Sequence, residues 1–122
     1  MLKKVLVVDD SATVRQQVRM ALSRSEFQVV EAVDGLDGKQ KLDANRDISL
    51  VICDVNMPRM NGIEMLEVVK SQPRHARLPV VMLTTEGQPA LIQRAKRAGA
   101  KGWIVKPFKA NLLVAAAHKL TS

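Results

Sequence analysis

This chain contains five short apolar runs, and a segment with helical periodicity follows each of them. The runs begin near Lys4, Phe27, Leu50, Pro79 and Gly102. The run at Leu50 is rich in branched residues and lacks polar alternation, which indicates a strand covered on both faces. Five strand–helix units in one short chain therefore predict a parallel sheet with helices on both sides.

The expected fold class is α/β: a doubly wound parallel sheet of five strands. The run at Phe27 is half polar, which favours a place near an edge. Helices are predicted over about residues 13–24, 35–45, 62–71, 89–98 and 109–120. Their expected core-facing residues include Leu36 and Leu42 in the second helix, and Leu112, Leu113, Ala116 and Leu120 in the last.

Length and composition limit the classes of protein to which this chain can belong. The 122 residues are expected to form a single domain, 1–122, with no output domain attached. No apolar run is long enough to cross a bilayer, the N-terminus does not resemble a signal peptide, and Cys53 is the single cysteine. These features favour a cytoplasmic location and no membrane partner.

The formal net charge is +7, from 19 lysines and arginines against 12 aspartates and glutamates. The basic residues are scattered, aromatic residues make up 2% of the chain, and no nucleic-acid-binding motif is present. We expect no nucleic-acid partner. The remaining interpretations are a solvated basic surface and an acidic protein partner. His75 and His118 are expected to be ordinary surface residues.

Polar residues follow the apolar runs at the points where strands are predicted to end. Asp9 and Asp10 follow the first run, Asp54 the third, Thr84 the fourth and Lys106 the fifth. Parallel strands place these ends at one edge of the sheet, where α/β proteins bind ligands. Three carboxylates brought together repel one another unless a cation lies among them. An oxygen-only cluster without His or Cys favours Mg²⁺.

A carboxylate beside Mg²⁺ is suited to nucleophilic attack on phosphorus, which would give an aspartyl phosphate. Lys106 would place a positive charge next to one phosphoryl oxygen, and Thr84 would donate its hydroxyl to another. The residues therefore predict phosphoryl transfer to a carboxylate of this cluster.

The chain resembles a response-regulator receiver domain along its whole length. The resemblance is carried by VLVVDDS, by D-V-N-M-P-x-M-N-G after the third run, by the two threonines after the fourth, and by AGAKGWIVKPF. It implies a flavodoxin-like (βα)5 sheet with strand order 2-1-3-4-5. It also implies that Asp54 is the phospho-acceptor and that Asp9, Asp10, Asp54 and the backbone carbonyl of Asn56 hold Mg²⁺. It also implies that Thr84 is the switch hydroxyl, that Lys106 senses the phosphate, and that the Lys106–Pro107 bond is cis.

Within that family the chain is most similar to the stand-alone chemotaxis type. The resemblance implies that Asn56 and Glu86 tune the rate at which the phosphoryl group is lost. It implies a histidine kinase as phosphodonor, a flagellar motor switch protein as a possible target, and a monomer or a weak phosphorylation-dependent dimer. Such a domain catalyses only its own phosphorylation and dephosphorylation. The expected output face comprises Ile92, Lys96, Trp103, Val105 and Lys119.

Departures from the family pattern leave alternatives open. Trp103 stands where the family usually has Tyr or Phe, which puts the usual rotamer switch in doubt. A phosphorelay intermediate and a single-domain regulator of a pathway other than chemotaxis are the nearest alternatives. An Mg²⁺-dependent aspartyl phosphatase of the haloacid dehalogenase type is disfavoured, because it needs a second acid where Asn56 stands.

Overall fold

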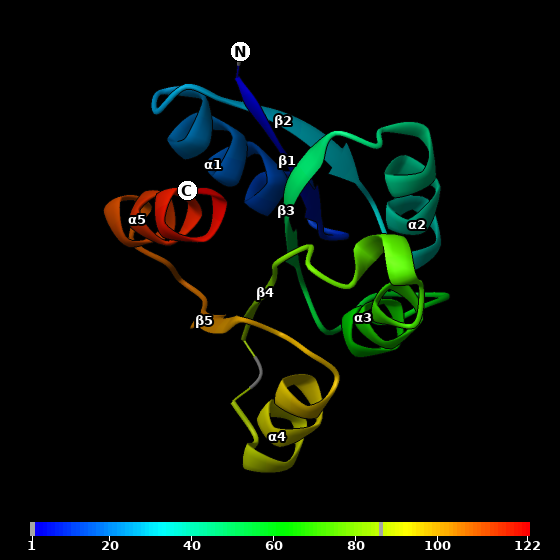
Figure 1. Cartoon of the computed structure of the whole chain (residues 1–122). Coiled ribbons are helices and arrows are strands. Elements are labelled where there is room, and N and C mark those ends of the chain that lie inside the picture. Colours follow the sequence, from blue (N-terminus) through cyan, green and yellow to red (C-terminus); the bar gives the residue numbers. More distant parts are fainter. Residues whose placement is uncertain (1, 86) are drawn as a thin grey trace.

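One parallel sheet of five strands forms the centre of the molecule, and helices cover both of its faces (Figure 1). The computed structural model describes residues 2–85 and 87–122. The strand order is β2-β1-β3-β4-β5, so the predicted fold class and strand order are confirmed. The strands are β1 (Lys3–Val8), β2 (Phe27–Ala32), β3 (Ile48–Cys53), β4 (Val80–Thr84) and β5 (Gly102–Val105).

The helices begin and end within a few residues of the predicted limits, and turn chemistry explains several of the boundaries. Side chains of Ser11, Asp34 and Asn61 accept hydrogen bonds from the first turns of the helices that follow them. The helices are α1 (Ala12–Ser23), α2 (Gly35–Ala44), α3 (Gly62–Lys70), α4 (Pro89–Arg97) and α5 (Ala110–Thr121), with a short 3₁₀ helix, η1 (Pro73–His75).

The two faces of the sheet carry separate apolar cores, because strand side chains alternate between faces. On one face Leu6 and Val8 of β1 pack with residues of α2, α3 and α4. On the other face Val5 and Val7 pack with residues of α1 and α5. Both faces of the central strands are therefore apolar, which is why these strands appear in the sequence as unbroken apolar runs.

Two leucines predicted to face the core are exposed instead. Leu36 is 39% exposed and Leu112 is 58% exposed. In α5 the buried residues are Leu113 and Ala117, one helical turn apart, so Leu112 lies about a quarter-turn away from the core. The same reasoning applies to α2, where Leu42 is buried and Leu36 is out of phase with it. In the described part of the chain, no helix combines the length and the apolar character needed to cross a membrane.

Candidate functional site

Strand register places the predicted site residues at one edge of the sheet. The Asp54 backbone N–H donates to the Val8 carbonyl at 2.9 Å, which continues the pairing of β3 with β1. The Lys106 N–H likewise donates to the Thr84 carbonyl at 2.9 Å, which continues the pairing of β5 with β4. Because all strands are parallel, the residues that follow them share the carboxyl edge of the sheet. The predicted convergence of Asp9, Asp54, Thr84 and Lys106 is therefore observed.

Three carboxylates form an oxygen-only cluster at this edge. Asp9, Asp10 and Asp54 each offer an oxygen, and these oxygens lie within 4.8 Å of one another. Asp9 and Asp54 are buried, with 1% and 7% of their surfaces exposed, whereas Asp10 faces solvent. A small set of carboxylates open to water on one side fits Mg²⁺, which keeps part of its water shell when it binds proteins.

Asp54 is held by donors on several sides. One carboxylate oxygen, Oδ1, accepts from the Val55 backbone N–H at 2.8 Å. The other, Oδ2, lies 3.5 Å from Nζ of Lys106, and Thr84 makes a side-chain hydrogen bond to the same carboxylate. Burial, and then the nearby charge of Asp9, nevertheless raise the pKa of Asp54. This carboxylate is therefore oriented by hydrogen bonds but destabilised in its charged form.

Lys106 pairs more closely with Asp9 than with Asp54. Its Nζ lies 2.7 Å from Asp9 Oδ2, while Asp9 Oδ1 accepts from the Ser11 backbone N–H at 2.8 Å. The ammonium thus bridges two buried carboxylates and offsets part of their mutual repulsion. The predicted cis Lys106–Pro107 peptide bond is present next to this lysine.

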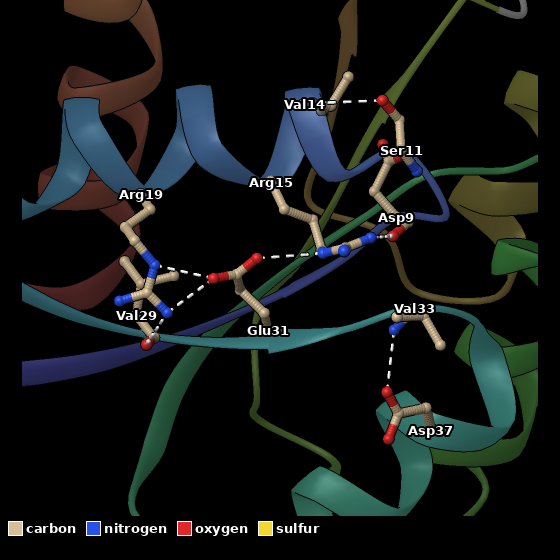
Figure 2. A network of polar contacts seen from close by, with 9 residues as sticks. All are labelled: Asp9, Ser11, Val14, Arg15, Arg19, Val29, Glu31, Val33 and Asp37. Atoms are coloured by element: carbon tan, nitrogen blue, oxygen red, sulfur yellow. Dashed lines mark hydrogen bonds and ion pairs between the residues drawn. The ribbon is translucent and has the colours of Figure 1, made fainter.

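Arg15 is a site neighbour that the sequence analysis missed (Figure 2). Its Nη1 donates to the backbone carbonyl of Asp9 at 2.6 Å, and its Nε donates to Glu31 at 3.0 Å. Glu31 also accepts from Arg19, and the two arginines lower the pKa of Glu31 although partial burial opposes them. Arg15 follows the N-cap Ser11 by one helical turn, which is a sequence signal that it would point back toward Asp9.

A second missed feature fixes the loop after Asp54. Arg59, in a left-handed backbone conformation with φ of 65°, donates through Nε to Asp34 Oδ2 at 2.7 Å. Asp34 is buried and also accepts from the Asp37 backbone N–H at 2.9 Å. That backbone hydrogen bond and the Arg59 guanidinium hold the pKa of Asp34 below its usual value, although burial opposes them. The ion pair joins the loop of the candidate acceptor to the start of α2.

The start of α3 packs directly against the acceptor backbone. The Gly62 N–H donates to the Val55 carbonyl at 2.9 Å. A Cβ placed on Gly62 would lie 1.8 Å from the Asp54 carbonyl oxygen, which no side chain could tolerate. The helix is then fixed by a capping box between Asn61 and Glu64. Gly62 is therefore required by close packing at the site.

The residues predicted to tune phosphate loss are only partly described. Asn56 is exposed, in the loop that follows Asp54. Glu86 lies outside the residues that the structure describes.

The residues expected to form an output face lie on α4, β5 and α5. Ile92, Lys96 and Trp103 line one small cavity of about 60 Å³, and Trp103 is partly buried against one of the two apolar cores. Val105 is 53% exposed and Lys119 faces solvent, and both lie outside that cavity. The structure thus brings three of the five residues together.

Comparison with known proteins gives one consistent result. Residues 5–118 match the family described as response regulator receiver domain. The chain is 44% identical over 111 residues to chemotaxis protein CheY1 of Helicobacter pylori, covering 90% of each chain. It is similar in structure to Vibrio cholerae chemotaxis protein CheY4, with a TM-score of 0.92, 38% identity and coverage of 98% and 99% of the two chains. It also resembles a chain of the CheX–CheY–BeF₃–Mg²⁺ complex of Borrelia burgdorferi, with a TM-score of 0.89, 26% identity and coverage of 98% and 89%.

Proposed function

This chain belongs to the response regulator receiver domain family and is of the chemotaxis CheY type, and from that premise we propose that it is a phosphorylation-dependent signalling switch. In the proposed reaction a histidine kinase supplies a phosphoryl group and Asp54 accepts it. The observation that carries the proposal is the placement of Asp54, which is buried beside Lys106 at 3.5 Å and hydrogen-bonded to Thr84.

The residues around Asp54 support this chemistry atom by atom. A carboxylate oxygen of Asp54 attacks phosphorus, a phosphorus–oxygen bond forms, and the phosphorus–nitrogen bond to the donor histidine breaks. The Lys106 ammonium lies close enough to pair with a phosphoryl oxygen on Asp54, and the Thr84 hydroxyl is available to a second one. The Val55 N–H holds one oxygen of Asp54 in place during the attack.

We propose that Asp9, Asp10 and Asp54, together with the backbone carbonyl of Asn56, hold Mg²⁺ at this site. Support comes from the three carboxylate oxygens within 4.8 Å of one another. It also comes from the similarity to a CheY chain in a complex that contains BeF₃ and Mg²⁺. When bound, the ion would neutralise charge on the transferred group. Arg15 and Ser11 would hold the Asp9 backbone and carboxylate in position for it.

We further propose that phosphorylation changes the affinity of the face formed by α4, β5 and α5 for a protein target. In chemotaxis that target would be a flagellar motor switch protein. Ile92, Lys96 and Trp103 already share one cavity on this face, so a movement of Trp103 would change the surface around it. The net charge of +7 favours an acidic target surface. Asn56 and Glu86 would set the lifetime of the phosphorylated form.

Intact mass after incubation with acetyl phosphate and Mg²⁺ tests the phosphorylation step. We expect one phosphoryl group on the native chain and none on Asp54→Asn or when EDTA replaces Mg²⁺. Asp47→Asn is the matched control, because Asp47 is an exposed carboxylate paired with Lys4 and should leave the reaction unchanged. Phosphorylation of the Asp54→Asn variant, or no phosphorylation of the native chain, would refute the proposal.

A kinetic measurement separates a switch from a phosphorelay intermediate. The phosphorylated chain is mixed with a histidine phosphotransfer protein, and the loss of the phosphoryl group from Asp54 is followed over time. If the chain is a switch, it loses the phosphoryl group to water at a rate that the histidine phosphotransfer protein does not change. Transfer to the histidine faster than hydrolysis would assign the relay instead.

A further inference from the structure

A cavity with several arginines in its wall lies at the end of the sheet opposite to Asp54. It has a volume of about 380 Å³, within the range of pockets that bind small molecules. Its walls come from the segments that precede β3 and β4 and from the first residues of β3. Asp54 and Thr84 lie at the other ends of the same two strands. The two sites are therefore separated by the length of the sheet.

The lining of this cavity is strongly basic. Arg46, Arg74 and Arg77 all contribute to it, and Asn45 and Ser49 add polar groups. Among the residues that the structure describes, no acidic one lines it. Arg74 forms an ion pair with Asp43 at the rim. Within the described residues, neither Arg46 nor Arg77 has a carboxylate partner, and both are exposed. Two guanidinium groups thus remain available to an anion.

The segment that carries two of these arginines is held in place by Lys70. Its Nζ donates to the backbone carbonyls of His75 at 3.3 Å, Ala76 at 3.2 Å and Leu78. The 3₁₀ turn adds a backbone hydrogen bond from His75 to Gln72 at 3.0 Å. A ligand would therefore meet a wall that is already ordered, which reduces the entropic cost of binding.

His75 lies in the wall of the same cavity and is not an ordinary surface residue. Its Nε2 is buried and has no hydrogen-bond partner among the described residues. Burial, and then the charge of Arg74, lower the pKa of His75, with Lys70 acting in the same direction and Asp43 against it. The imidazole is accordingly neutral at pH 7. Its NMR signal would therefore respond to a negative charge bound nearby.

We propose that this cavity is a binding site for a small ligand that carries a phosphate group, separate from the acceptor site at Asp54. Planar guanidinium groups match phosphate oxygens in geometry and charge, and Arg46 and Arg77 are the two that no carboxylate engages. Free phosphate and the phosphate of a nucleotide share this chemistry, and the experiment distinguishes them.

The test is an NMR titration of the native chain in EDTA, followed through the imidazole signals of its two histidines. His75 lines the cavity, whereas His118 lies on α5 against Phe27 and serves as an internal control. Inorganic phosphate, AMP and adenosine are added separately at constant ionic strength and pH. We expect phosphate and AMP to shift the His75 signal saturably and to raise its pKa, with His118 unchanged.

Arg46→Gln and Arg77→Gln should each weaken this binding by about tenfold, the typical loss for a charged hydrogen bond. Arg97→Gln, an equal charge change at an exposed position on α4, should leave it within about twofold. AMP binding more tightly than phosphate would identify a nucleotide site, and equal affinities would identify a phosphate site. The proposal is overturned by a non-saturable response, by adenosine binding as tightly as AMP, or by equal losses in the Arg77 and Arg97 variants.

Discussion

Asp54 combines orientation with electrostatic destabilisation, and the two have different causes. The Val55 N–H, Lys106 and Thr84 orient its carboxylate. Burial and the charge of Asp9 nevertheless raise its pKa, so the folded chain carries an unfavourable charge at neutral pH. The position therefore combines a fixed orientation of the carboxylate with a cost in stability for its charged form.

Removing that charge should stabilise the protein. For a carboxyl group with a raised folded-state pKa, the folded state binds more protons, so stability falls as pH rises through that range. Asp54→Asn should consequently increase the free energy of unfolding by about 1–2 kcal/mol at pH 7 in EDTA, measured with guanidinium chloride. Asp47→Asn, at an exposed carboxylate, should change it by less than about 0.5 kcal/mol.

Magnesium should stabilise the native chain more than it stabilises the Asp54→Asn variant. A ligand that binds the folded state stabilises it by mass action, and Asp54→Asn removes one of the proposed ligands. The native chain should gain more stability from millimolar Mg²⁺ than the variant does. A variant less stable than the native chain in EDTA would contradict the electrostatic argument.

Asp34 should contribute to the pH dependence of stability in the direction opposite to that of Asp54. Its pKa is lowered by the Asp37 backbone N–H and by Arg59, so its stabilising effect is present above the unfolded value near 3.8 and is lost below it. Asp34→Asn should lower stability at pH 7 and flatten the loss of stability between about pH 4 and pH 2. Urea unfolding at a series of pH values measures both effects. If the variant loses stability with falling pH as steeply as the native chain does, Asp34 is not the source of that loss.

Among the secondary-structure elements, the start of α3 packs directly against the backbone of the site. Gly62→Ala would place a methyl group 1.8 Å from the Asp54 carbonyl oxygen, so the helix or the acceptor loop must move. We expect a loss of about 3 kcal/mol or more in unfolding free energy and a slower reaction with acetyl phosphate. Gly87→Ala is the matched control, since a Cβ there meets no atom within 4 Å among the described residues other than its chain neighbours. Equal effects of the two substitutions would refute the packing argument.

Much of this arrangement follows from local sequence, and the exceptions have physical reasons. The ends of parallel strands share an edge, so Asp9, Asp54 and Lys106 could be placed together from the apolar runs alone. Contacts between distant loops leave no such periodic signal, and for that reason the Arg59–Asp34 ion pair was missed. The exposed Leu112 reflects a helix phase that apolar content alone does not determine.

At the scale of the whole molecule, the two edges of the sheet differ. Phe27, Val29 and Ala32 of edge strand β2 are buried, whereas every residue of the other edge, β5, is partly or largely exposed. Strand β5 also carries Trp103 and leads directly into Lys106. The weakly packed edge is thus the one that connects the candidate acceptor site with the expected output face.

Native-state hydrogen exchange should reveal this asymmetry. Amides of β5 are expected to exchange at least about tenfold faster than those of β2, because local opening of a poorly buried strand costs less free energy. Residue-resolved exchange by NMR at pH 7 makes the comparison within one sample. Since both strands are edges, equal exchange rates would show that edge position, and not burial, controls opening.

The lysine that bridges Asp9 and Asp54 follows Asp9 by 97 residues and Asp54 by 52 residues in the chain. During synthesis both aspartates are therefore made well before the lysine that pairs with them. Under the proposed function, unfinished or misassembled copies would be poor substrates for a kinase. Phosphorylation of Asp54 would then depend on the last strand being in place, because Lys106 follows β5 directly.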